Sequence, residues 1–108
     1  MQFRIAVNET PENVIFFIKN QYNVYRYSAK TYIMLGNVLE IYHNEDYDKT
    51  LSENADGWLY YNTHMDFFPI DEKITVSQEI KIAENIKNFF DSCSLKSEII
   101  FESDEYIT

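Results

Sequence analysis

Residues 30–43, KTYIMLGNVLEIYH, decide the fold, because two apolar runs flank Gly36 and Asn37. A glycine at the first position of a two-residue loop is typical of a tight β-hairpin with a type II′ turn. That loop pairs Leu35 with Val38 and Met34 with Leu39. Alternation then predicts one face with Tyr32, Met34, Leu39 and Ile41 and another with Ile33, Leu35, Val38, Glu40 and Tyr42. Because both faces are partly apolar, the hairpin is either covered on both sides or leaves one face for a partner.

A long strand is expected downstream of this hairpin. Residues 44–56 are polar, acidic and without periodicity, which is typical of a loop. Residues 57–68, GWLYYNTHMDFF, follow as the strand, and Pro69 ends it. We expect the core face of this strand to carry Leu59, Tyr61, Thr63, Met65 and Phe67, and its other face to carry Trp58, Tyr60, Asn62, His64, Asp66 and Phe68.

Two amphipathic helices are predicted, one before and one after these strands. Thr10 followed by Pro11 is typical of an N-cap with proline at the first helical position, in a helix that ends near Gln21. Thr75 or Ser77 can cap the second helix, which the apolar spacing extends to about Ser92. The expected buried stripes contain Val14, Ile15, Phe16, Phe17 and Ile18 in the first helix, and Val76, Ile80, Ala83, Ile86 or Lys87, Phe89 and Phe90 in the second.

Shorter strands complete the expected sheet. Residues 2–7 alternate, with Phe3, Ile5 and Val7 inward, and residues 97–103 form a last strand before an end at 104–108 that should fray. Residues 23–27 form either a short strand or an extended connection. We therefore predict one α+β domain over residues 1–108, in the order β-α-β-β-β-α-β, with a mainly antiparallel sheet of five to six strands and two helices packed on one face.

The distribution of charge predicts the kind of partner. The chain has 18 acidic and 9 basic residues, for a net charge of −9. Residues 40–56 and 98–108 together carry all of this excess, and Lys49 is the only base in either stretch. Such a field accelerates encounter with a cationic protein and repels nucleic-acid phosphate, so a basic protein partner is expected and direct nucleic-acid binding is not. The competing interpretation is that the acidic stretches only keep a tyrosine-rich domain soluble.

The compartment is predicted from hydropathy and from cysteine usage. No apolar run reaches 18 residues, and the first residues lack the parts of a secretory signal, so no membrane association is expected. Cys93 is the single cysteine and has no His or Arg beside it to activate the thiol. These observations favour a cytoplasmic protein.

Aromatic residues supply the candidate binding site. Nine Tyr, eight Phe and one Trp are more rings than one core is expected to hold, so some should lie at the surface. Carboxylates can steer a basic partner while buried rings provide the anchor. The expected partner-binding residues are Tyr42, Asp46, Tyr47, Asp48, Glu53, Asp56, Trp58 and Tyr60. If both sheet faces are covered, these rings are core residues instead.

An enzyme is the first alternative. His43 follows one strand while His64 and Asp66 lie on another, so neighbouring strands could assemble a metal or acid–base site. The spacing is generic, and the sequence lacks His-Glu-x-x-His, Cys-x-x-Cys and the glycines of phosphate loops. We expect no catalytic residue, metal or cofactor, and keep as alternatives a small metal-binding or hydrolytic enzyme using these three residues, and an acidic mimic of nucleic acid with carboxylates at phosphate-like spacing along one edge.

The whole chain resembles a known class of small bacterial proteins in size, acidity and aromatic content. The resemblance includes the stretch DGWLYYNTHMDFFP, followed by an amphipathic helix and the strand SEIIFES. The sequence is similar in these respects to immunity proteins of polymorphic-toxin and contact-dependent growth inhibition systems. The resemblance implies a non-enzymatic cytoplasmic inhibitor that occludes the cleft of a toxin, often a nuclease. It assigns no residue roles.

Overall fold

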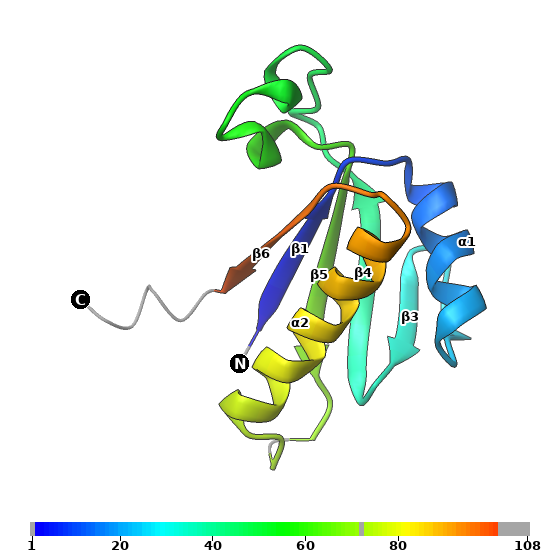
Figure 1. The fold of residues 1–108 in the computed structure, drawn as a ribbon. Coiled ribbons are helices and arrows are strands. Elements are labelled where there is room, and N and C mark those ends of the chain that lie inside the picture. The colour runs from blue at the N-terminus through cyan, green and yellow to red at the C-terminus, as the bar shows by residue number, and fades with distance from the viewer. Residues whose placement is uncertain (1, 72, 102–108) are drawn as a thin grey trace.

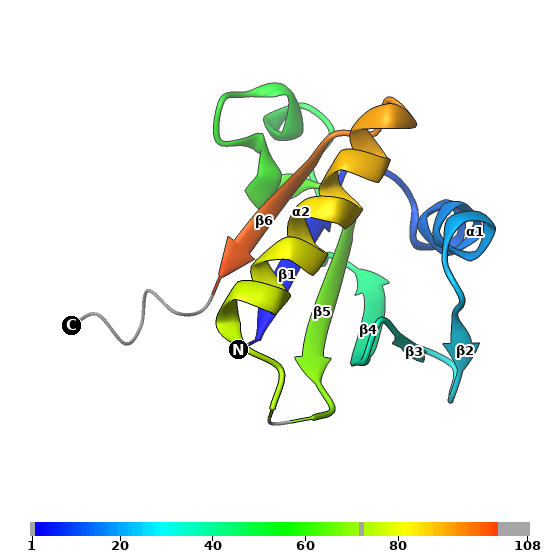
Figure 2. The ribbon, with the colours of Figure 1, turned by 60° about the horizontal axis from the view of Figure 1, so that its bottom comes forward.

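Six antiparallel strands form one sheet in the order β2-β3-β4-β5-β1-β6, and both helices lie against the same face of it (Figure 1, Figure 2). The computed structural model describes residues 2–71 and 73–101. The predicted α+β class, element order and placement of the helices are confirmed, and β2 is the additional short strand. The elements are β1 (Phe3–Val7), α1 (Pro11–Gln21), β2 (Tyr25–Arg26), β3 (Thr31–Met34), β4 (Asn37–His43), β5 (Thr63–Pro69), α2 (Val76–Ser92) and β6 (Ser97–Phe101).

The core lies between the sheet and the two helices. At its centre the rings of Phe3 and Phe67 stack with their centroids 4.5 Å apart. The inward face predicted for residues 2–7 and the predicted division of the hairpin residues between two faces are confirmed, because a period of two residues places alternate side chains on one side of a strand. In the hairpin, the face with Tyr32, Met34, Leu39 and Ile41 is the buried one. The buried apolar residues are Phe3, Ile5, Ala6, Val7, Val14, Ile18, Tyr32, Met34, Leu39, Ile41, Met65, Phe67, Ala83, Ile86 and Phe90.

Local capping sets the helix limits as the sequence predicts. The Thr10 hydroxyl accepts a hydrogen bond from the Asn13 amide at 3.4 Å, and Pro11 is the first helical residue. Of the two predicted caps for α2 the structure uses Thr75, in a reciprocal capping box with Gln78. No helix in the described ranges is long and apolar enough to cross a membrane.

The helical stripes differ from the prediction at three positions. Phe16 and Val76 were expected to be buried, yet Phe16 is 64% exposed and Val76 is also exposed. The carboxylate Glu79 is buried instead, one residue before the predicted Ile80. Its Oε1 accepts a hydrogen bond from Asn37 Nδ2 at 3.2 Å, so a polar contact holds the start of α2 to the start of β4.

The register of the β3–β4 hairpin differs from the prediction. Met34 pairs with Asn37 and Ile33 with Val38, so the turn residues are Leu35 and Gly36, with φ of 50° and 73°. Two successive positive φ values are what a type I′ turn requires, and this turn matches the right-handed twist of the strands. The predicted pairing of Leu35 with Val38 is therefore wrong. Because the observed pairing is shifted by two residues from the predicted one, every strand residue keeps its predicted face.

The long strand predicted over residues 57–68 is the largest correction. Residues Gly57–Tyr60 form a short 3₁₀ helix, η2, and β5 begins only at Thr63. Leu59, expected in the core, is 46% exposed, whereas Met65 and Phe67 are buried as predicted. A Cβ atom on Gly57 would lie 2.1 Å from the carbonyl oxygen of Ser52, so this glycine permits a close chain approach that a continuous strand would not make.

The last strand is confirmed over Ser97–Phe101, with Ile99 and Phe101 packed against the core. Residues 102–103 of that prediction and the end expected to fray at 104–108 lie outside the described residues.

Candidate functional site

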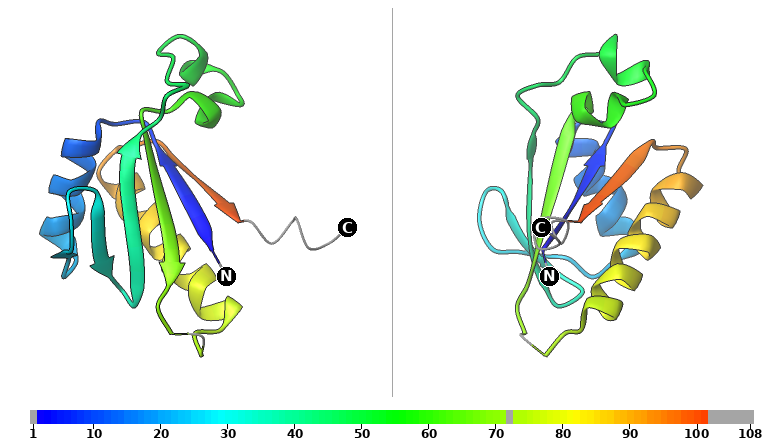
Figure 3. Two further views of the ribbon diagram at one scale, coloured as in Figure 1. Left: turned by 180° about the vertical axis from the view of Figure 1, so that it is seen from behind. Right: turned by 90° about the vertical axis from the view of Figure 1, so that its left-hand side faces the viewer.

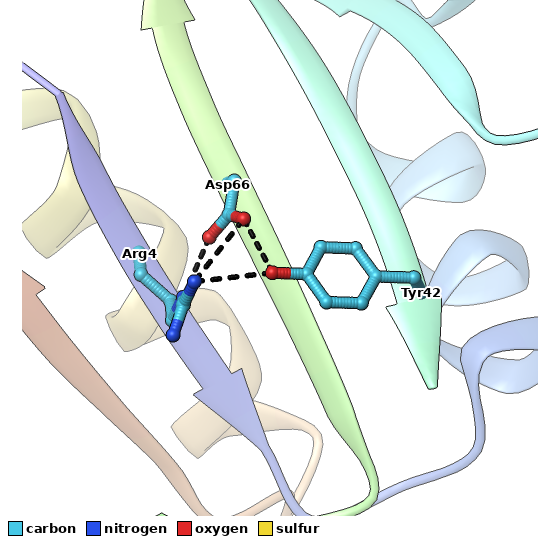
Figure 4. A network of polar contacts seen from close by, with 3 residues as sticks. All are labelled: Arg4, Tyr42 and Asp66. Atoms are coloured by element: carbon cyan, nitrogen blue, oxygen red, sulfur yellow. Dashed lines mark hydrogen bonds and ion pairs between the residues drawn. The ribbon is translucent and has the colours of Figure 1, made fainter. Parts of the chain in front are cut away.

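The sheet face opposite the helices carries a polar network at its centre (Figure 3, Figure 4). Arg4 on β1 donates from Nε to Asp66 Oδ1 at 2.6 Å and from a terminal nitrogen to the Tyr42 hydroxyl oxygen at 3.1 Å. Tyr42 donates its own proton to Asp66 Oδ2. The three side chains come from the adjacent strands β1, β5 and β4, so the sheet register itself brings them together.

The network changes the acidity of its members and of a neighbour. Burial, followed by the hydrogen bond to Asp66 and the charge of Asp66, raises the pKa of Tyr42 to about 12. Burial and the charge of Arg4 lower the pKa of His64, against the opposing effect of nearby carboxylates. Tyr42 therefore remains a proton donor at neutral pH and cannot act as a base there.

Residues 44–60 form a structured segment at the end of the sheet where β4 finishes and β5 starts (Figure 1). Asn44 is buried, and its Nδ2 donates to the carbonyls of Leu59 and Tyr61 at 3.0 and 2.9 Å. Asp48 Oδ1 accepts the amides of Thr50 and Leu51 and so caps the 3₁₀ helix η1 (Leu51–Glu53). The start of the stretch predicted to be a loop is thus held to the residues just before β5, and its middle is held by hydrogen bonds within the stretch.

This segment and β4 border two adjoining depressions that share Glu45 and Asp46. The first has a volume of about 670 Å³ and the second about 420 Å³. The first is lined by Lys30, Glu40, Tyr42, His43, Asn44, Glu45 and Asp46, and the second by Glu45, Asp46, Tyr47, Asp48, Leu51, Leu59 and Tyr60. We call these lining residues together the acidic surface. Four of them are carboxylates and one is a lysine, Lys30, so negative charge predominates along both depressions.

The acidic surface contains five of the eight residues predicted to bind a partner: Tyr42, Asp46, Tyr47, Asp48 and Tyr60. Trp58 is half-buried within η2, while Glu53 and Asp56 are exposed on the same segment outside both depressions. The prediction missed the other seven lining residues, which are Lys30, Glu40, His43, Asn44, Glu45, Leu51 and Leu59. Glu40 and Glu45 lie in the acidic stretch 40–56, which could have identified them as site residues. Leu59 was assigned to the core because the predicted strand began too early.

The residues of the enzyme alternative are not assembled at one place. Tyr42 pairs with His64 and His43 with Thr63, so successive positions on β4 put His43 and His64 on opposite faces of the sheet. Asp66 shares a face with His64 but is held by Arg4 and Tyr42. Within residues 2–71 and 73–101, no three His, Cys, Asp or Glu side chains are grouped so that they could hold a metal ion.

The second acidic stretch of the sequence, residues 98–108, is described only as far as 101. Its Glu98 is exposed and pairs in register with Ala6, on the face that carries the polar network. Among the described rings, Tyr25 and Tyr27 are strongly exposed, at 66% and 72%. Neither was predicted to bind a partner, although alternation over residues 23–27 placed both on one side.

Comparisons of the chain with protein-family models, with curated proteins and with solved structures give no match, so the function is argued from the geometry of the site alone.

Proposed function

We propose that this protein is a non-enzymatic inhibitor that binds a basic protein through the acidic surface, and that it acts as a cytoplasmic immunity protein against a bacterial toxin. The observation that carries the proposal is the pair of adjoining depressions in which Glu45 and Asp46 are shared and Lys30 is the one lining base. Carboxylates in this arrangement attract Lys or Arg side chains during approach. The rings of Tyr42, Tyr47 and Tyr60 supply the apolar contact area that holds the complex.

The conformation of residues 44–60 supports this role. Binding by a flexible loop loses free energy to ordering, typically about 0.5–1.5 kcal/mol for each immobilised side chain. Here the hydrogen bonds of Asn44 and Asp48 fix the backbone before a partner arrives. Glu45 and Asp46 are therefore presented at set positions, which favours recognition of one arrangement of basic groups.

The experiment compares two variants that each remove three negative charges. The acidic-surface variant combines Glu40→Gln, Glu45→Gln and Asp46→Asn, and the helix variant combines Glu12→Gln, Glu84→Gln and Asp91→Asn. Glu12, Glu84 and Asp91 are exposed on α1 and α2, in the layer away from the sheet face with the polar network. Immobilised wild-type protein and both variants are used to capture proteins from a lysate of the native host.

We expect a basic protein that the wild type and the helix variant retain and that the acidic-surface variant loses. Expression of that captured protein in a test bacterium should arrest growth, and co-expression of the wild type should restore it. Equal capture by both variants, or growth arrest that the wild type does not relieve, would contradict the proposal. Competition of the captured protein by duplex DNA would identify a toxin cleft that normally binds nucleic acid.

A further inference from the structure

A row of apolar side chains crosses the sheet face away from the helices, where β4 begins and therefore far from residues 44–60. Tyr25 pairs with Ile33, Ile33 with Val38 and Val38 with Phe68, so four neighbouring strands each contribute one residue. Directly opposite residues of antiparallel strands share a face, with Cβ atoms about 5 Å apart. We call Tyr25, Ile33, Val38 and Phe68 the apolar row.

The apolar row is accessible. Ile33, Val38 and Phe68 are half-buried and Tyr25 is exposed, whereas their neighbours on the core face, Met34, Leu39 and Phe67, are buried. Exposed Leu35 and Ile70 adjoin the same end, where the Ile70 amide donates to the Gly36 carbonyl at 3.0 Å. A continuous apolar strip of this kind on a water-facing surface is typical of an interaction site.

The apolar row shares its sheet face with Glu40 and Tyr42 of the acidic surface. Val38 and Glu40 are two residues apart on β4, which separates them by about 7 Å, and Tyr42 lies about 13 Å from Val38. The side chain of Glu40 makes no hydrogen bond or ion pair with another residue of the described ranges, so its charge is available to a ligand. Asp66 is different, because Arg4 already neutralises it.

We propose that the apolar row and the acidic surface form one bipartite docking face for a basic protein, which presents an apolar group about 7–13 Å from its Lys or Arg side chains. This inference rests on the proposed function and extends it to the uncovered sheet face. Charge complementarity selects the occupant. A second copy of the chain would bring the same net charge of −9 and would repel the acidic surface, whereas a basic partner satisfies both parts.

The test uses synthetic peptides as the probe, so that it does not depend on the natural partner. The bipartite peptide is fluorescein-labelled and contains four Arg, a Gly-Ser-Gly-Ser spacer and a Leu-Val-Leu-Trp block. The spacer spans at most about 14 Å, which matches the separation on the protein. In the second peptide four Ser replace the apolar block. Dissociation constants are measured by fluorescence anisotropy at low salt.

Four variants are compared with the wild type. The row variant combines Ile33→Thr and Val38→Thr, which keep β-branched side chains on the strands. Tyr25→Ser alters the row at its most exposed position and leaves the core intact if the row variant folds poorly. Phe16→Ser is the matched control, because Phe16 is an equally exposed ring on α1 in the other layer. The fourth is the acidic-surface variant.

We expect the wild type and Phe16→Ser to bind the bipartite peptide about tenfold more tightly than the Ser peptide, the effect of burying roughly 60 Å² of apolar surface. The preference should fall below about twofold in the row variant and should also decrease in Tyr25→Ser. An unchanged preference in these two variants, or no preference in the wild type, overturns the inference. Independently, equal binding of the Ser peptide by the wild type and the acidic-surface variant would contradict the proposed function.

Discussion

Tyr42, Asp66 and Arg4 are half-buried polar residues, and the side chain of each forms hydrogen bonds with the other two (Figure 4). The network occupies the middle of the sheet face that we propose as a docking face. Because its charges are internally compensated, the network adds no free charge to this face.

Replacement of Tyr42 by Phe should lower the free energy of unfolding by about 1 kcal/mol at pH 7, since the Asp66 carboxylate loses a donor. The loss should diminish at high pH. The pKa of Tyr42 rises from 10 in the unfolded chain to about 12 in the folded protein, so its contribution is complete below pH 10 and disappears as the pH rises through 12. Urea unfolding at pH 7 and from pH 10 to 12 measures both effects.

The control for this prediction is Tyr27→Phe, which removes the hydroxyl of a highly exposed ring. It should change the free energy of unfolding by less than about 0.5 kcal/mol at every pH. A difference between Tyr42→Phe and the wild type that stays constant from pH 7 to 12 would show that the raised pKa of Tyr42 is not linked to folding.

Gly57 is the residue on which the conformation of residues 44–60 depends. Gly57→Ala should lower the free energy of unfolding by about 2 kcal/mol, because the new methyl group meets backbone and not a movable side chain. Hydrogen exchange should become faster at the amides of residues 44–60. The comparison is Gly36→Ala, which places a methyl group at a φ of 73° in the distant hairpin turn and should leave exchange in the 44–60 segment unchanged.

Among the secondary-structure elements, β4 and α2 meet through a polar contact inside an apolar core. Asn37 and Glu79 are both fully buried and share one hydrogen bond. The only side-chain oxygen of Asn37, Oδ1, and the second carboxylate oxygen of Glu79, Oε2, have no hydrogen-bond partner among the described residues. Two buried acceptors are therefore left without a donor, which costs stability.

Glu79→Gln should raise the free energy of unfolding by about 1 kcal/mol, because the amide nitrogen supplies a donor for Asn37 Oδ1 and a buried charge is removed. The measurement is urea unfolding at pH 7. Glu84→Gln, on the exposed side of the same helix, is the matched control and should leave stability within about 0.5 kcal/mol. A loss of stability in Glu79→Gln would imply that the carboxylate itself is required.

At the scale of the whole molecule, the two faces of the sheet have different roles. The helices cover one face of the sheet, and residues 44–60 lie beyond one end of it (Figure 2, Figure 3). The apolar row lies on the other face, where β4 begins. A large net charge of −9 acts over a distance comparable with the Debye length, which is about 10 Å at 0.1 M salt. The long-range field and the short-range apolar contacts should therefore affect different kinetic steps.

Association with the captured basic protein should slow by about tenfold or more when NaCl rises from 50 to 500 mM, while the dissociation rate changes little. The acidic-surface variant should show a slower association rate and a weaker salt dependence than the helix variant, although both carry the same net charge. Stopped-flow mixing measures these rates. An identical salt dependence in the two variants would indicate that only total charge matters and not its position.

The elements that the sequence predicts correctly are those governed by neighbouring residues. The caps at Thr10 and Thr75 depend on contacts three residues away, and the inward faces of β1, β3 and β4 follow from a period of two residues. The hairpin keeps its faces despite the error in register, because only a shift by an odd number of residues would exchange them. Fold class follows from the order of such elements.

The amino-acid sequence by itself determined the helices, the strand faces and the clustering of acidic charge, because each depends on residues close together in the chain. Tertiary structure decided where β5 begins, that Glu79 is buried and which carboxylates meet which rings. The start of β5 and the acidic surface depend on Asn44 bonding to carbonyls 15 and 17 residues away and on the approach of Gly57 to Ser52. Buried Glu79 bonds to Asn37, 42 residues away. Contacts between distant segments leave no periodic trace in the sequence, so only the folded chain reveals them.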